Sequence, residues 1–208
     1  MLVPCLLQLK RGEIMIIDIS SNQGKIDWQK VSRQDVTRVI LRSTTQNGKL
    51  DVRTLENYNG ILQNMNDKLQ SVDFYKFSYV RDYTSARIES MRTLATLVRN
   101  GIRLEVMDTF YLDLEGHGGR DYTKEEANEV ILGYFDTCLD LNVNLGLYFN
   151  YNYAKNIVDT LWRDLPLWIA RYNTKLGDVK PWTPELWQYT SKGTVDGIQG
   201  YVDISKKV

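Results

Sequence analysis

Short apolar runs alternate with longer, helically periodic segments along most of this chain. A short apolar run between polar loops is typical of a buried strand, whereas apolar residues at spacings of three and four indicate one face of a helix. We expect strands at residues 15–19, 39–43, 72–79, 112–115, 145–149 and 167–170, and helices at 27–31, 51–66, 84–100, from 123 onward and at 153–161. This alternation predicts an α/β fold with a parallel sheet.

Two of the expected helices have distinct ends and faces. The segment from Thr123 opens with Thr-Lys-Glu-Glu, which is a capping-box signature. Its expected core face consists of Ala127, Val130, Ile131 and Tyr134. The helix at 84–100 is expected to end at Gly101 and to bury Ile88, Met91, Leu94, Ala95 and Val98.

The pattern changes after residue 170. Residues 186–189 and 201–204 form two further short strands, joined through glycine and Asp-Gly turns that leave no room for a helix. Six alternating units followed by strands alone predict a TIM-like barrel that begins as β/α and closes with β only. We therefore expect one barrel domain over residues 15–208.

The first fourteen residues do not fit that domain. Residues 1–9 are apolar, but the run is too short for a secretion signal, and its positive charges, Lys10 and Arg11, follow it instead of preceding it. We expect residues 1–14 to be a disordered or non-native extension, with translation starting at Met15. Without a signal peptide, a protein made in the cytoplasm would need a holin, cell lysis or a dedicated secretion route to leave the cell.

Composition narrows the class of protein. The chain has 208 residues, of which 43% are hydrophobic, and no apolar stretch long enough to span a bilayer. Acidic and basic residues number 26 each and the pI is about 6.6. This balance argues against nucleic acid as a partner, and we expect a soluble monomer that does not bind membranes.

The segment 112–116, Leu-Asp-Leu-Glu-Gly, carries the strongest chemical signal. Because side chains alternate along a strand, Asp113 and Glu115 would share one side while Leu112 and Leu114 pack on the other. Two carboxylates that close cannot ionise independently, so one stays protonated as an acid while the other stays charged. Cleavage of a glycosidic bond needs both a protonated and a charged carboxyl group. A solvated sheet face or a cation site remains an alternative for this motif.

Two further acids lie near the chain ends inside apolar strands. Asp18 follows Ile16-Ile17 and Asp203 follows Tyr201-Val202, and closure of a barrel would make the first and last strands neighbours. Four carboxylates could then meet at one end of the barrel. Alternatively, Asp18 caps the following turn and Asp203 is an ordinary surface acid.

Aromatic residues gather at or near the predicted strand ends, namely Tyr75, Tyr79, Tyr148, Trp168, Tyr172, Trp187 and Tyr189. Flat rings stack on sugar faces, but aromatics at strand ends are also ordinary barrel core. We expect about half of them to line a groove and the rest to pack.

Other catalytic constellations find little support. A zinc site needs several nitrogen or sulfur ligands, and the chain offers His117, Cys5 and Cys138 at remote positions. We expect His117 to be a loop residue, Cys138 to be core and no disulfide to form. Neither a G-x-S-x-G elbow nor a glycine-rich phosphate loop is present.

Taken together, five ordered blocks resemble the glycoside hydrolase family 25 lysozymes, the muramidases of phage lysins and bacterial autolysins. The blocks are Ile-Asp-Ile-Ser at 17–20 with the following Gln-Gly and Ile-Asp-Trp, Leu-Asp-Leu-Glu-Gly at 112–116, Leu-Trp-Ile-Ala-Arg-Tyr at 167–172, Leu-Trp-Gln-Tyr-Thr-Ser at 186–191, and Gly-Ile-Gln-Gly with Val-Asp at 197–203. The resemblance runs from Met15 to the C-terminus and implies a (β/α)5β3 barrel of eight strands and about five helices.

The resemblance also implies an activity, hydrolysis of the β-1,4 bond between N-acetylmuramic acid and N-acetylglucosamine in peptidoglycan, without a metal or other cofactor. It implies Glu115 as proton donor and Asp113 as the group that orients the acetamido substituent or stabilises the intermediate, with Asp18 and Asp203 completing an acidic floor. The residues expected to bind the glycan strand are Tyr75, Tyr148, Trp168, Tyr172, Trp187 and Gln188.

Three questions stay open at this level. The nucleophile is either a carboxylate or the acetamido oxygen of the substrate itself. The barrel could instead bind peptidoglycan without cleaving it. It could also hydrolyse another amino-sugar polymer, such as chitin.

Overall fold

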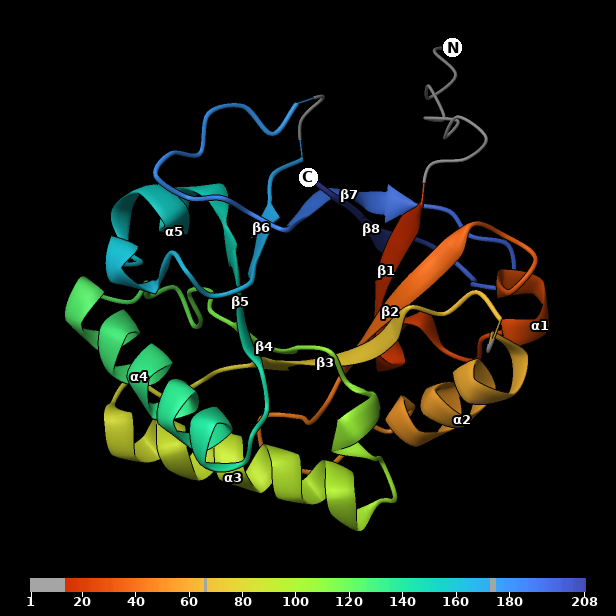
Figure 1. Cartoon of the computed structure of the whole chain (residues 1–208), viewed down its shortest axis with the longest axis horizontal. Helices are drawn as coiled ribbons and strands as arrows, with labels where there is room; N and C mark the ends of the chain where they lie inside the picture. The colour runs from red at the N-terminus through yellow and green to blue at the C-terminus, as the bar shows by residue number, and fades with distance from the viewer. Residues whose placement is uncertain (1–13, 66, 173–174) are drawn as a thin grey trace.

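The fold is a closed eight-stranded barrel with helices around its outside except beside β7 and β8 (Figure 1). The computed structural model describes residues 14–65, 67–172 and 175–208. The strands are β1 Met15–Ile19, β2 Val36–Arg42, β3 Ser71–Phe77, β4 Phe110–Asp113, β5 Leu145–Asn150, β6 Leu167–Ala170, β7 Leu186–Gly193 and β8 Val202–Lys207. Neighbours from β1 to β7 are parallel, and β8 runs antiparallel to both β7 and β1. This confirms the predicted (β/α)5β3 order.

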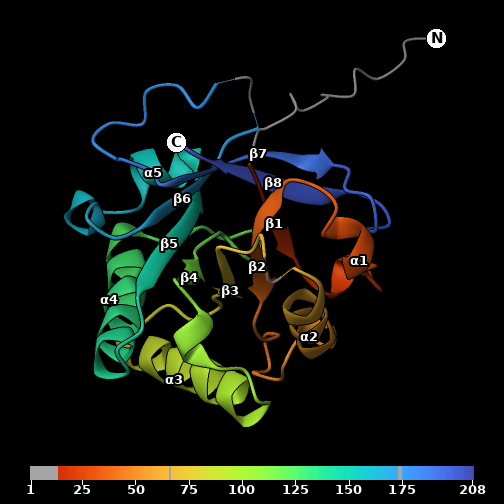
Figure 2. The same cartoon turned by 45° about the vertical axis from the view of Figure 1, so that its right-hand side comes forward.

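Within the described residues, five α-helices follow the first five strands: α1 Trp28–Val31, α2 Thr54–Asn64, α3 Tyr83–Arg99, α4 Lys124–Asp140 and α5 Tyr151–Asn156. Short 3-10 helices occur at η1 Ser21–Gln23, η2 Leu104–Val106 and η3 Thr160–Trp162. Figure 2 shows that α3 and α4 lie side by side along one flank, whereas β7 and β8 close the barrel without a covering helix. No helix in the described ranges combines the length and apolarity required to cross a bilayer.

The predicted helix at 51–66 begins later because Asp51 has another role. Its carboxylate accepts hydrogen bonds from the Ser21 hydroxyl at 3.0 Å and from the Arg53 backbone N–H at 3.1 Å. These bonds tie the loop after β2 to the loop after β1, so α2 starts at Thr54. The Thr123 capping box is confirmed, as is burial of Ala127 and the rest of the α4 core face.

Two helix predictions were wrong in part. The helix predicted at 153–161 starts earlier and stops at Asn156, and η3 follows it. The buried face of α3 consists of Ala86, Ser90, Thr93, Leu94 and Leu97, so that only Leu94 of the predicted core set is fully buried. Gly101 does follow the helix, with the positive φ of 79° that a glycine adopts readily. The predicted extension at 1–14 lies outside the described residues except for Ile14, and it stays a prediction.

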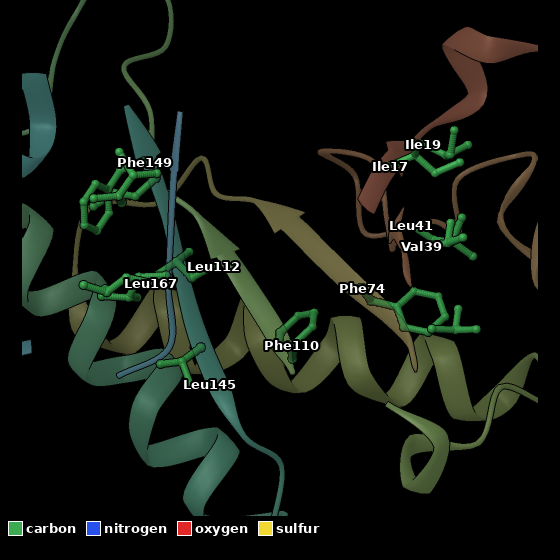
Figure 3. Packing of buried hydrophobic residues seen from close by; sticks show 14 of the residues in the cluster. Ile17, Ile19, Val39, Leu41, Phe74, Phe110, Leu112, Leu145, Phe149 and Leu167 are labelled. Carbon is green, nitrogen blue, oxygen red and sulfur yellow. The ribbon is translucent and has the colours of Figure 1, made fainter. Parts of the chain in front are cut away.

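Alternation along the strands divides the core into two layers. The outer layer lies between the sheet and the helices, and Figure 3 shows part of it, from Ile17 and Val39 to Phe149 and Leu167. The inner layer fills the barrel and consists of Ile16, Ile40, Tyr111, Tyr148, Trp168, Ala170 and Leu186, with Tyr75 packed against it. Cys138, on α4, belongs to the outer layer as predicted.

A charged network closes the amino-terminal end of the barrel beneath this inner layer. Arg38 is almost fully buried and pairs with Asp73 and with Glu185, the latter at 3.0 Å. Asp73 also accepts the backbone N–H groups of Asp108 and Thr109, both at 2.9 Å. Because Arg38 and Asp73 are both almost fully buried, each of the two charges depends on the other for its compensation.

We expect Asp73→Asn to lower the free energy of unfolding by about 3 to 5 kcal/mol, because it leaves the buried Arg38 guanidinium without its closest counter-charge. Urea denaturation measures the change. Asp164→Asn is the matched control, since Asp164 is 92% exposed and its carboxylate lies 3.9 Å from the exposed Arg163 guanidinium. Equal stability of the two variants would contradict the role assigned to this network.

Candidate active site

Barrel closure brings together two acids that are 185 positions apart in the sequence. The antiparallel register of β1 and β8 places Asp18 directly opposite Asp203. Asp18 is buried, and Asp203 is half-buried at the mouth of the barrel. The predicted neighbourhood of the first and last strands is therefore confirmed, and neither acid is an isolated cap or surface residue.

The other two acids come from the end of β4. The strand ends at Asp113, but its extended path continues, since the Leu114 N–H donates to the Tyr148 carbonyl at 2.9 Å. Leu112 and Leu114 are fully buried in the outer layer. The alternation that the sequence predicted thus places Asp113 inside the barrel and Glu115 one step above it at the rim.

Burial raises the pKa of all four carboxyl groups, and repulsion from a neighbouring carboxylate adds to the rise for Asp18, Asp113 and Glu115. For Asp18 the largest cause is burial, followed by the charge of Asp203. A side-chain hydrogen bond between the two acids raises the pKa of Asp18 further and opposes the rise at Asp203. The Asp18–Asp203 pair therefore holds a proton more readily than an isolated aspartate does.

The β4 pair behaves in a similar way. Burial raises the pKa of Asp113 most, the charges of Glu115 and Asp18 add to the rise, and the guanidinium of Arg42 opposes it. Burial and then the charge of Asp203 raise the pKa of Glu115. The buried Oδ1 atom of Asp113 has no hydrogen-bond partner among the described residues. One of its two oxygens is thus available to a donor that arrives from the mouth.

Gln188 connects the acids to two tyrosines. Its Oε1 atom accepts the hydroxyls of Tyr148 and Tyr172, both at 2.9 Å. With the oxygen occupied in this way, its Nε2 atom donates to the Asp18 carboxylate at 3.0 Å. Gln188 therefore fixes the position of Asp18 and orients both phenol rings at the mouth.

Tyr75 completes the set that the structure gathers here. Burial raises the pKa of its phenol, and the charges of Asp18 and Asp113 raise it further, because all three groups lie in one environment. Of the residues expected to bind a glycan, the structure therefore places Tyr75, Tyr148, Tyr172 and Gln188 beside the acids.

The two tryptophans do not lie there. Trp168 is only 2% exposed, and its indole N–H donates to the Ser205 hydroxyl at 2.9 Å, so it packs beneath the acids and offers no open ring to a sugar. Trp187 faces the outside of the sheet, where its ring lies 5.9 Å from Tyr189 and its N–H donates to the Arg171 carbonyl. The two causes differ. Trp187 points outward because its neighbour on β7, Gln188, points inward, whereas Trp168 points into the barrel but is covered by packing against Tyr111 and Tyr148.

Two residues of the mouth were missed from the sequence. Arg42 shares the inner face of β2 with Arg38 and Ile40, and its Nε atom is buried without a partner among the described residues. Tyr201 stands two positions before Asp203, the spacing that turns two side chains to one side of an extended segment, and it is largely exposed. The alternation of side chains along residues 36–42 and 201–205 already groups Arg42 with Arg38 and Ile40, and Tyr201 with Asp203. Only closure of the sheet shows that these faces are the interior.

No metal site accompanies the acids. His117 lies in the loop after β4, as predicted, and its ring meets Tyr79 edge-on at 4.8 Å. Within the part of the chain that the structure describes, no group of three or more His, Cys, Asp or Glu side chains is arranged to hold a metal ion.

An α/β barrel with coupled carboxylates at the carboxyl ends of its strands has the architecture of a carbohydrate-cleaving enzyme. Comparison with known proteins agrees with this class. Residues 17–198 match the model for glycosyl hydrolases family 25, and the chain belongs to that family.

Individual relatives are distant in sequence. The autolytic lysozyme of Clostridium acetobutylicum is 25% identical over 190 residues, which cover 91% of this chain and 54% of that protein. The chain thus spans about half the length of this curated relative.

Two solved structures share the fold. The modular autolysin LytC of Streptococcus pneumoniae, in complex with a synthetic peptidoglycan ligand, has a TM-score of 0.79 and 24% identity, covering 95% of this chain and 47% of LytC. The spore cortex lytic enzyme SleM of Clostridium perfringens has a TM-score of 0.80 and 20% identity, covering 97% of this chain and 69% of SleM. At these identities, the two likenesses show the fold alone.

We expect Asp18→Asn to stabilise the protein at neutral pH. An aspartate has a pKa of about 3.9 in the unfolded chain, whereas that of Asp18 is raised in the fold. Between these two values the unfolded state alone ionises, so the native protein loses stability as pH rises through this window. Urea denaturation should show a gain for the variant at about pH 7 and none at about pH 3. A gain of equal size at both pH values would refute this origin.

Proposed function

We propose that this protein is a lysozyme that hydrolyses the β-1,4 bond between N-acetylmuramic acid and N-acetylglucosamine in bacterial peptidoglycan. The observation that carries the proposal is the cluster of four carboxyl groups with raised pKa values at one barrel mouth. Four such groups cannot all be ionised at neutral pH, so the mouth holds both a proton to donate and negative charge to stabilise a cation.

Glu115 is the general acid and base in this proposal. It stands at the rim, above Asp113, where a glycosidic oxygen can approach. Its raised pKa lets it hold a proton at neutral to mildly acid pH, and transfer of that proton to the leaving oxygen is the step that bond cleavage requires. After the leaving group departs, the same carboxylate can accept a proton from water.

Asp113 stabilises the intermediate. Its unpartnered Oδ1 atom can accept the N–H of an acetamido group, which would hold that group beside the anomeric carbon. Burial favours the neutral form of Asp113, but the neighbouring Arg42 guanidinium favours its charged form, and a protonated Glu115 no longer repels that charge. A charged Asp113 also opposes the positive charge that develops on the sugar ring. Either an attacking carboxylate or an attacking acetamido oxygen is compatible with this role.

The remaining mouth residues bind and orient the glycan strand. Asp18 and Asp203 form the acidic floor, and Gln188 holds Tyr148 and Tyr172 with their hydroxyls directed inward. Half-exposed Tyr172 offers a ring face on which a sugar can stack. No cofactor takes part in this scheme.

The family and the named relatives support the substrate. The curated relative is an autolytic lysozyme, and LytC was solved with a synthetic peptidoglycan ligand. In this proposal the protein acts as a monomer on the cell wall.

We expect Glu115→Gln to lower the rate of wall lysis by at least about 100-fold, because the amide cannot donate the proton. The fall in turbidity of a wall suspension measures the rate, and circular dichroism should show an unchanged fold. Glu105→Gln, at an exposed position in η2, is the matched control and should keep full activity. Full activity of Glu115→Gln would show that Glu115 is not the general acid.

Product analysis tests the bond and the polymer. Digested peptidoglycan, reduced with borohydride, should yield muropeptides ending in reduced N-acetylmuramic acid, as mass spectrometry detects. Chitin should release no fragments. Ends formed by reduced N-acetylglucosamine, or release from chitin alone, would contradict the proposed specificity, and wall binding without new reducing ends would indicate a binding barrel.

A further inference from the structure

The outward face of α3 carries an apolar stripe that no described element covers. Ile88, Met91 and Val98 are 45%, 47% and 53% exposed. Together with Ala95 they follow one another at spacings of three, four and three residues. This is the repeat of a coiled-coil seam, in which one helix presents a narrow apolar line to another.

The stripe borders a hollow instead of a flat surface. A cavity of about 560 Å³ is lined by Met91, Leu94, Ala95 and Val98 of α3, by Leu104 of η2 and by Leu141 after α4, with Arg92 and Arg99 at its edge. The cavity lies where α3 meets η2 and the end of α4. Apolar side chains from a partner could enter it.

Positive charge flanks this stripe on α3. Arg92 and Arg99 follow Met91 and Val98 in the sequence, and neither has an ion pair in the described structure. The single acid of α3, Glu89, is turned inward, with its carboxylate 3.7 Å from the Lys76 ammonium. The side chains of α3 that line the cavity are therefore apolar or cationic.

These charges discriminate between the kinds of partner. A second copy of this chain would bring Arg92 and Arg99 against their equivalents, and like charges beside a helical seam repel. An anionic bilayer would satisfy the charges, but it binds protruding apolar side chains and leaves a hollow unfilled. A helix with apolar residues along one line and acidic residues on either side satisfies both requirements.

We propose that the α3 stripe and its hollow form a docking site for an acidic amphipathic helix of another polypeptide segment. Its apolar side chains fill the cavity between Met91, Val98, Leu104 and Leu141, and its glutamates or aspartates pair with Arg92 and Arg99. The site lies on the helical flank, away from the carboxylates at the barrel mouth, so docking and catalysis use different surfaces.

A synthetic three-heptad peptide tests the proposal directly, with isoleucine and leucine at the seam positions and glutamate on both flanks. Fluorescence anisotropy of the labelled peptide should show saturable binding to the intact protein. A peptide of the same seam with lysine flanks should bind at least tenfold more weakly. Phosphatidylglycerol vesicles in a co-sedimentation assay, and sedimentation velocity of the protein alone, examine the two other partners.

Substitutions on α3 test whether the peptide binds at the stripe. Val98→Glu introduces charge into the stripe and Arg99→Glu reverses a flank, and each should weaken peptide binding at least tenfold while wall lysis stays unchanged. Val52→Glu, at a position that is 81% exposed in the loop before α2, is the matched control and should bind normally. The proposal fails if both peptides bind alike, if neither binds, if the α3 variants bind normally, or if vesicles or self-association replace peptide binding.

Discussion

The antiparallel pairing of β1 with β8 is the constraint on which the chemistry of this barrel depends. Closure at this seam sets Asp18 opposite Asp203, while the parallel neighbours of β4 place Asp113 and Glu115 at the same mouth. Burial in one partly dry volume raises the pKa of all four carboxyl groups, so they hold protons to a higher pH than isolated carboxyl groups do. Closure of the barrel thus gathers, at one mouth, carboxyl groups that can hold and donate protons.

The two ends of the barrel interior use charge in opposite ways. At the amino-terminal end, Arg38 has carboxylate partners in Asp73 and Glu185, and the network stabilises the closed sheet. At the carboxyl end the acids lie beside one another and repel. An apolar layer that includes Tyr111 and Trp168 separates the two ends. Ion pairs that stabilise the fold lie at one end, and carboxyl groups that repel one another and are suited to catalysis lie at the other.

The error about the buried face of α3 has a physical explanation. Its buried side carries small and hydroxyl-bearing residues, since the Ser90 hydroxyl bonds to that of Thr137 on α4 at 2.8 Å. Gly133 permits this close approach, because a Cβ atom there would lie 2.7 Å from that of Ala86. Hydrophobicity alone therefore selected the wrong side. Close packing buried the small polar face and left the larger apolar residues outside, where they form the proposed docking site.

The sequence by itself determined the order of strands and helices, the cap at Thr123 and the shared side of Asp113 and Glu115. Each depends on local backbone geometry, namely the period of a strand or the unpaired N–H groups of a helix. Tertiary structure decided that Gln188 faces Asp18 while Trp187 faces outward, that Arg42 lies at the mouth, and that Trp168 is covered. Alternation defines two faces of every strand, but only the closed sheet determines which face becomes the interior.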